Sequence, residues 1–220
     1  IAVDDLCKER LLTSAGIPKD LVSTLKNFVD LSKFKSRNIL PEKPRSALIF
    51  SNYASNTDIV INIKSACKRF GIDRVDVIGS GSGNSTASPQ NVLPEYDVVF
   101  AKARCAIEAL AVGCAVIVAD FPGLGGMVRS SKVEEFRRLN FGIRTMQYSK
   151  VTEESILKEL SAYNRDDAKL VSSFIREDAD MEKAIDGLET FYSDAIYHAK
   201  ILSEVSPWVW ASSASRYIAT

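Results

Sequence analysis

The sequence has 220 residues, which is enough for one domain of ordinary size and part of a second. Hydrophobic residues make up 46% of it and charged residues 25%, a composition typical of a globular protein and not of a disordered chain. Lysine plus arginine and aspartate plus glutamate each total 28, so no overall field favours nucleic acid as a partner.

The cysteines and the histidine offer no metal site. Cys7, Cys67, Cys105 and Cys114 form no CxxC pair and no cluster with His198, the one histidine of the sequence. Because structural zinc sites need closely spaced cysteine and histidine ligands, we expect neither a metal nor another cofactor. We interpret Cys105 and Cys114 as buried thiols, which favours a reducing cytosol.

No apolar run approaches the roughly 20 residues that span a bilayer, and no signal peptide is recognisable. The sequence begins at Ile1 and its first residues resemble the end of a strand, which predicts a truncated chain. We therefore expect a cytoplasmic location, with peripheral membrane attachment only through a part absent from this sequence.

The first 44 residues predict the end of one domain and a linker. Asp4 and Asp5 can cap a helix that runs to about Ala15. Residues 21–28 alternate between apolar and polar side chains, which indicates a strand. The polar, proline-containing segment that ends at Pro44 is typical of a linker.

From residue 45 the pattern alternates between strands and helices. We expect buried strands over 46–51, 75–78, 97–100 and 115–119, helices over 56–70, around Glu108 and over 132–139, a loop over 79–91 and an edge strand over 141–144. Three more helices follow over 153–163, 166–174 and 181–204. The chain is therefore predicted to be an α/β protein with a Rossmann-like, doubly wound parallel sheet over residues 45–204, extra C-terminal helices and a tail over 205–220.

One helix with a single glutamate is the most informative stretch. Residues 106–113 read Ala-Ile-Glu-Ala-Leu-Ala-Val-Gly, and a strand ending at Asp120 and a glycine-rich loop over 121–126 follow. Open α/β sheets bind ligands beyond the carboxyl ends of their strands, so Glu108 could accept the hydroxyls of a ribose there. The alternatives are a solvent-facing residue or an ion pair with Arg104, one turn earlier.

Two cations follow the third predicted strand. Lys102 and Arg104 stand at its carboxyl end, where they could neutralise a diphosphate leaving group. The alternative is a pair of ordinary surface charges. Residues 51–53, after the first strand, could also touch a sugar or phosphate.

Glycines follow the second predicted strand. Gly79, Ser80 and Gly81 would let the backbone approach a phosphate with its N–H groups. The segment is not a dinucleotide-binding fingerprint, since Asn84 interrupts the pattern and no helix starts promptly. A flexible surface loop is the alternative.

A second group of glycines precedes a predicted helix. Gly123 and Gly125 would then place a phosphate near the N-terminus of that helix. The alternative is a tight turn. His198, Trp208 and Trp210 are more typical of packing and of anchoring the tail than of a site.

These stretches resemble the nucleotide-sugar half of retaining glycosyltransferases with two Rossmann-like domains, the GT-B type (family 4-like). Residues 1–16 resemble the helix that ends the family's N-terminal domain, residues 27–34 its interdomain signature, and residues 108–113 its donor helix. The resemblance implies that Glu108 binds the ribose of a nucleotide sugar and that the loop after residue 79 lies close to the diphosphate. It further implies a transfer with retention and without an obligatory metal.

Two departures from the family stand out. The family often has a second glutamate eight residues before the first, contacting the donor sugar, and this sequence has Phe100 there. The family also often has arginine and lysine shortly after the first strand of this domain. Residues 51–57 contain no base, so Lys102 and Arg104 would substitute.

The resemblance implies a donor-binding half of a hexosyl-type glycosyltransferase. A missing N-terminal domain would hold a glycan, lipid or small-molecule acceptor, so this fragment alone is expected to be inactive. One alternative is a nucleotide-sugar epimerase of the same fold. The other is a non-catalytic domain that binds a nucleotide or a partner protein, which Phe100 favours.

Overall fold

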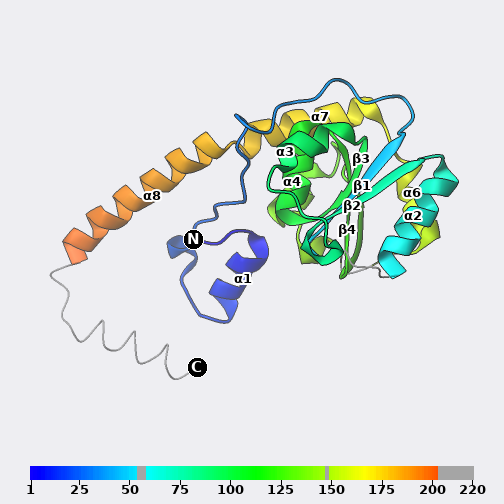
Figure 1. The fold of residues 1–220 in the computed structure, drawn as a ribbon. Helices are drawn as coiled ribbons and strands as arrows, with labels where there is room; N and C mark the ends of the chain where they lie inside the picture. Colours follow the sequence, from blue (N-terminus) through cyan, green and yellow to red (C-terminus); the bar gives the residue numbers. More distant parts are fainter. Residues whose placement is uncertain (54–57, 147–148, 203–220) are drawn as a thin grey trace. The chain divides into compact units, whose positions relative to one another are not determined.

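The computed structural model describes residues 1–53, 58–146 and 149–202, with side chains up to residue 198 (Figure 1). The chain divides into two compact units, Ile1–Met181 and Glu182–Thr220, which we describe separately. The beginning of the predicted helix over 56–70, the end of the last predicted helix and the predicted tail lie outside the described residues.

A five-stranded sheet in the order β2-β1-β3-β4-β5 is the centre of the first unit. β1 (Ser46–Phe50), β2 (Arg74–Ile78), β3 (Val98–Ala101) and β4 (Ala115–Asp120) are parallel, and β5 (Gly123–Met127) pairs antiparallel with β4. β3 and β4 are continuous apolar runs because both of their faces are buried. The predicted α/β class and Rossmann-like parallel sheet are confirmed.

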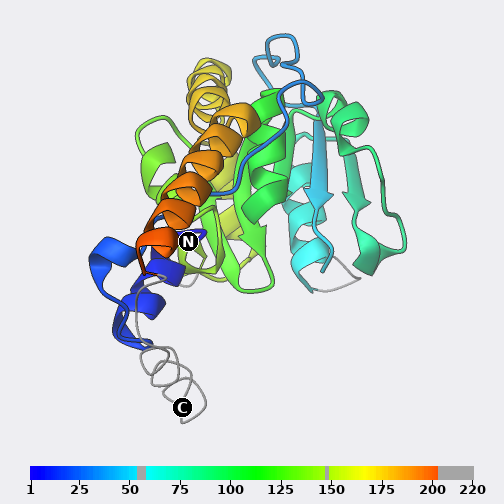
Figure 2. The same ribbon diagram turned by 90° about the vertical axis from the view of Figure 1, so that its left-hand side faces the viewer.

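Helices cover both faces of the sheet (Figures 1 and 2). α2 (Asp58–Phe70) and α6 (Glu153–Leu160) contact each other on one face, and α4 (Ala103–Val112) and α7 (Arg165–Asp178) contact each other on the opposite face. Alternate residues of β3 follow this division, since Val98 and Phe100 belong to the core under α2, while Val99 and Ala101 belong to the core under α4. The shorter helices are α3 (Pro89–Val92) and α5 (Val133–Arg138).

The N-terminal segment belongs to the same unit as the sheet. α1 (Asp5–Thr13) is capped by Asp4, whose carboxylate accepts the N–H of Cys7 at 2.7 Å. The predicted strand over 21–28 is wrong, because the segment pairs only through one isolated bridge, between Thr24 and Ala2, and follows a 3-10 turn (Lys19–Leu21). The predicted domain boundary at residue 44 stays a prediction.

Contacts distant in sequence hold this segment in place. The N–H of Val29 donates to the carbonyl of Ala179 at 2.8 Å. The side-chain amide of Asn140 accepts the N–H of Asn27 at 3.2 Å and donates to the carbonyl of Val3. The first residues of the chain are therefore anchored to the loop after α5.

Two predictions near the fifth strand are wrong. Residues 121–126 are not a loop, since Gly123–Met127 forms β5, and residues 141–144 are not a strand, since Ile143–Thr145 forms a 3-10 turn. The glycines explain the first error, because a Cβ on Gly123 would lie 2.2 Å from the carbonyl oxygen of Met146. Their lack of side chains lets another backbone segment lie against the strand, a role that a local pattern does not reveal.

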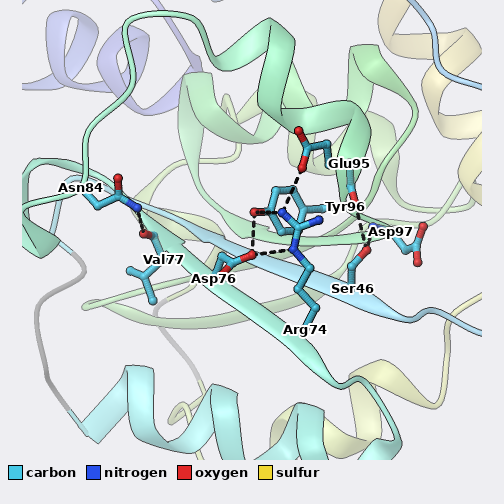
Figure 3. A network of polar contacts seen from close by, with 8 residues as sticks. All are labelled: Ser46, Arg74, Asp76, Val77, Asn84, Glu95, Tyr96 and Asp97. Atoms are coloured by element: carbon cyan, nitrogen blue, oxygen red, sulfur yellow. Dashed lines mark hydrogen bonds and ion pairs between the residues drawn. The ribbon is translucent and has the colours of Figure 1, made fainter.

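A polar network closes the amino end of the outer strand β2 (Figure 3). Arg74 contacts Asp76 at 2.8 Å, and both Glu95 and the hydroxyl of Tyr96 at 2.9 Å. The Tyr96 hydroxyl donates to Asp76 at 2.7 Å, which, together with Arg74, lowers the pKa of that carboxyl. The network pins the edge strand to the turn before β3.

The second unit begins within α8 (Met181–Leu202). No side chain between residues 182 and 198 is buried, and the large apolar residues exposed there are Ile185, Tyr192, Ile196 and Tyr197. Within the described residues, we find no helix with both the length and the apolar character needed to cross a membrane.

Candidate functional site at the carboxyl edge of the sheet

Three side chains gather where neighbouring strands end. Phe50 lies beside Ala101 in the register of β1 and β3, and Ala101 lies beside Val118 in the register of β3 and β4. The chain leaves these strands at Ser51, Lys102 and Asp120, so their side chains meet at one edge of the sheet.

Asp120 is the centre of this group. One of its carboxylate oxygens, Oδ2, accepts the hydroxyl of Ser51 at 2.8 Å and lies 3.0 Å from Nζ of Lys102. The other, Oδ1, accepts the N–H of Phe121 at 2.7 Å. The carboxylate is buried, and each oxygen has a partner that compensates for its loss of water.

Two aromatic rings enclose the lysine of this pair. Nζ of Lys102 lies 4.4 Å from the ring centroid of Tyr53 and 4.4 Å from that of Phe121, within range of a cation–π attraction. The two rings meet edge to face, with centroids 5.3 Å apart. They are 63% and 59% exposed, so aromatic surface remains open to a ligand beside the cation.

Glu108 lies on the second turn of α4 and is only 6% exposed. Its Oε1 accepts the Nε–H of Arg104 at 2.9 Å, while the Arg104 side chain is 74% exposed. Burial raises the pKa of Glu108, and Arg104 opposes that rise only in part. Within the described chain, Oε2 of Glu108 has no hydrogen-bond donor, so this oxygen can accept from a ligand.

Cys105 lies within the electrostatic influence of both carboxylates, Glu108 and Asp120. The pKa of its thiol is raised to about 11, first by burial and then by the charges of Glu108 and Asp120. Both carboxylates therefore act on the same small region at the start of α4. The thiol stays protonated at neutral pH and is a poor nucleophile.

Two cavities open at this edge. The larger, about 410 Å³, is lined by Ile59 on α2 and by residues between β4 and α6, among them Phe121, Gly123 and Lys150. The smaller, about 40 Å³, is lined by Ser51, Tyr53 and Asp120 and shares Phe121 with the larger one. Asp120 and the two rings that enclose Lys102 therefore line the smaller cavity.

The glycines after β2 serve close packing. A Cβ on Gly79 would lie 1.9 Å from the carbonyl oxygen of Ser51, and one on Gly81 would lie 2.6 Å from that of Asn52. The N–H groups of Ser80 and Gly81 both donate to Asn52. Phosphate binding by Gly79, Ser80 and Gly81 stays a prediction, and it would require the N–H groups of Ser80 and Gly81 to exchange partners.

The helix predicted over 132–139 is present as α5, but Gly123 and Gly125 do not directly precede it, and their binding of a phosphate stays a prediction. Both residues lie within β5, and the next helix, α5, begins only at Val133. A Cβ on Gly125 would lie 2.7 Å from the carbonyl oxygen of Thr145, so this residue too allows two backbones to approach. Gly123 nevertheless lines the larger cavity and so lies beside the site.

The sequence predicts some of this arrangement and misses the rest. Lys102, Arg104 and Glu108 do stand at the start of α4 as expected. The pairing of Lys102 with Asp120 and the enclosing rings of Tyr53 and Phe121 were not predicted. The available signal was positional, because Ser51, Lys102 and Asp120 each stand at the end of a buried strand.

Phe100 is a core residue and takes no part in the polar group around Asp120. It is fully buried on β3 and belongs to the core under α2 and α6. The described residues also hold no group of three or more His, Cys, Asp and Glu side chains suited to a metal ion.

No protein-family model matches the sequence, and no curated protein matches it either. Solved structures do match. A glycosyltransferase from Rickettsia africae superposes with a TM-score of 0.62 at 14% identity, over 89% of this chain and 62% of the other. The fold of this chain is therefore that of part of a GT-B glycosyltransferase.

Two further GT-B structures agree. Anabaena Alr3699/HepE, solved with UDP and glucose, gives a TM-score of 0.57 at 12% identity, over 87% of this chain and 62% of that one. A point mutant of Staphylococcus aureus TarM, solved with fondaparinux, alpha-GlcNAc-glycerol and UDP, gives 0.51 at 12% identity, over 86% and 42%. The chain thus spans less than two thirds of the length of these GT-B proteins, and identities this low establish the fold alone.

Proposed function

We propose that the chain binds the nucleotide diphosphate of a sugar donor at the carboxyl edge of its sheet. Together with residues outside this sequence, it would transfer a hexosyl group to a glycan, lipid or small-molecule acceptor, with retention of configuration. The observation that carries this proposal is the cation of Lys102, held between two exposed aromatic rings that line a cavity at this edge.

The chemistry of the site suits a diphosphate leaving group. Departure of the sugar leaves negative charge on the diphosphate, and cations fixed in advance stabilise that charge. Lys102 is fixed by Asp120, Arg104 is exposed at the start of α4, and Lys150 lines the larger cavity. The protein would contribute position and charge, without a nucleophile of its own.

Other groups suit the nucleoside. The unpartnered Oε2 of Glu108 can accept hydrogen bonds from the hydroxyls of a ribose, which a neutral glutamine oxygen would accept more weakly. The exposed rings of Tyr53 and Phe121 offer a surface on which a base or a sugar ring can stack. The bound UDP in the HepE and TarM structures makes UDP the first nucleotide to test.

Titration calorimetry with UDP, GDP and their sugar conjugates tests the proposal, first without metal and then with magnesium. We expect saturable binding that weakens at least about tenfold in Lys102→Met and in Glu108→Ala. Lys158→Met, at an exposed lysine on α6, is the matched control and should bind like the parent chain. Unchanged affinity in both site variants would reject this site.

A non-catalytic nucleotide-binding domain is the second candidate. Phe100 is buried in the core, so no carboxylate stands where the resembling family contacts the donor sugar. This candidate predicts that UDP and UDP-glucose bind with equal affinity, since nothing recognises the sugar.

Under the first proposal, glycosyl transfer is expected only when an N-terminal domain of the GT-B type is supplied. Full activity of this sequence alone would contradict that expectation.

A further inference from the structure

A third cavity lies at the opposite end of the sheet from the Lys102 site. Its volume is about 130 Å³, and it lies between α7 and residues 36–40, with Gly113 at one end. Gly113 precedes the first residue of β4, whereas Asp120 is the last, so the length of that strand separates the two sites. We call it the α7 cavity.

The lining of the α7 cavity is positively charged. It contains the side chains of Arg37, Arg165, Lys169 and Arg176, and none of its lining residues is acidic. Asp97 pairs with Arg37 at 3.1 Å, and Glu42 lies 3.4 Å from Arg165.

Two of these cations keep their charge uncompensated. Within the described chain, neither Lys169 nor Arg176 has an ion-pair partner. The guanidinium of Arg176 is nevertheless fixed, because it donates to the carbonyls of Phe34 and Ala111 at 2.8 and 3.0 Å. A positioned guanidinium and an exposed lysine therefore line one cavity.

A buried hydroxyl in the same lining lacks a partner. Ser172 is 6% exposed, and its Oγ forms no hydrogen bond to the described residues. Serines in helices usually donate to the carbonyl four residues earlier. Ser173 does so, to Lys169 at 3.0 Å, whereas Ser172 does not. An unpartnered buried hydroxyl costs free energy and calls for a ligand atom or another explanation.

We propose that the α7 cavity binds a phosphate group of a ligand other than the sugar nucleotide. Lys169 and Arg176 would supply the charge, and the Ser172 hydroxyl would donate to a phosphate oxygen. The volume is several times that of one water molecule and admits a phosphate group. The phosphate can be free in solution or belong to the headgroup of an anionic lipid.

The first test is a titration of the chain with inorganic phosphate at low ionic strength, followed by calorimetry. We expect saturable binding that weakens about tenfold in Lys169→Glu and severalfold in Ser172→Ala. Lys158→Glu on α6 is the matched control for the charge change and should bind normally. Ser172→Ala removes an unpartnered hydroxyl, so its melting temperature should not fall, which separates lost binding from lost folding.

The second test identifies the source of the phosphate. Each variant is sedimented with vesicles of phosphatidylcholine alone and of phosphatidylcholine with phosphatidic acid. Binding only to vesicles with phosphatidic acid, lost in Lys169→Glu and weakened in Ser172→Ala, assigns the cavity to a headgroup, while saturable binding of free phosphate assigns it to a soluble ligand.

The proposal is overturned if neither probe binds, or if both variants bind like the parent chain. A titration with UDP keeps the two sites apart. Lys169→Glu should leave UDP affinity unchanged, and saturation of the chain with UDP should leave phosphate affinity at the α7 cavity unchanged. The failure of either site therefore leaves the other testable.

Discussion

At the scale of single residues, Glu108 combines two opposing requirements. Its carboxylate is buried, which raises its pKa and disfavours the charged form, yet only the charged form is a strong acceptor for ribose hydroxyls. Arg104 compensates for part of that burial from an exposed position. If Glu108 binds a ligand at the expense of folding stability, replacing it should both weaken ligand binding and stabilise the fold.

Glu108→Gln tests this trade-off. The raised pKa means that Glu108 favours folding below its unfolded pKa and that this contribution is lost as the pH rises through its folded pKa. At neutral pH the neutral glutamine should therefore raise the midpoint of urea unfolding, while UDP affinity falls about tenfold or more. Equal UDP affinity in the two proteins would contradict a ligand role.

UDP affinity of the parent chain should also fall in acid. Because burial raises the pKa of Glu108, the loss should begin at a higher pH than the ordinary value of 4.5 would give. Calorimetric titrations between neutral pH and the onset of acid unfolding measure it. In Glu108→Gln this part of the pH dependence should disappear.

Lys102→Met should be strongly destabilising, because it leaves the carboxylate of Asp120 buried without its cation. We expect a loss of about 3–5 kcal/mol in the free energy of unfolding. Adding Asp120→Asn should restore much of it, since the uncompensated charge is then gone. Urea denaturation of the two single variants and the double variant measures the coupling, and additive losses would show that the pair does not act as one.

At the scale of elements, glycines decide where backbones can meet. Gly79 and Gly83 both have φ in the left-handed region, but only Gly79 lies against another chain segment. Gly83→Ala should cost about 1–2 kcal/mol from backbone strain alone. Gly79→Ala should cost at least about 3 kcal/mol because its Cβ would overlap the carbonyl of Ser51. Equal losses in thermal or urea unfolding would contradict this packing role.

The start of α4 carries backbone strain. Ala103 has φ +48°, and its N–H donates to the carbonyl of Phe141, which has φ +53°. Ala103→Gly should therefore raise the free energy of unfolding by about 1 kcal/mol. Ala106→Gly, in the same helix, is the control and should lower it by about 1 kcal/mol or more. A loss in both variants would show that residue 103 is not strained.

The elements that the sequence predicts well are those with their own local signal. β1, β3 and β4 are apolar runs, and α4 ends at Gly113, whose φ of +100° suits the end of a helix. β5 could not be predicted, because Gly-Leu-Gly-Gly has almost no intrinsic preference for a strand. Its structure depends on β4 and on the backbone that lies against its glycines.

At the scale of the whole molecule, the N-terminal segment could not be placed from the sequence. Arg138 pairs with Asp5 at 2.8 Å, and Asn27 and Asn140 meet although 113 residues separate them. Such contacts have no periodicity and no spacing that a sequence pattern could reveal. The doubly wound sheet, in contrast, follows from the alternation of strands and helices.

Acid should weaken the molecule over a defined range of pH. The pKa of Asp30 is lowered to about 2 by hydrogen bonds from Ser32 and Lys33, and those of Asp76 and Glu153 are lowered by hydroxyl donors, with further help from arginines. Their contribution to folding is full above their unfolded pKa of about 4 and is lost as the pH falls toward 2. Melting temperatures measured between neutral pH and pH 2 should therefore fall most steeply in this range, and a flat profile would contradict the assignment.

Both outer strands of the sheet are blocked along their free sides. The N–H of Met127 on β5 donates to the carboxylate of Glu159 at 2.8 Å, and that of Leu124 donates to the carbonyl of Ser149 at 2.9 Å. At the other edge, the side-chain amide of Asn84 donates to the carbonyl of Val77 at 3.1 Å, and Arg74 and Asp76 place charges on β2. An open sheet invites a stray strand from a neighbouring molecule, which is how fibrils and amorphous precipitates begin. Because these groups are already occupied in the described sheet, we expect a stray strand to add poorly at either edge, so that the concentrated protein resists growth strand by strand.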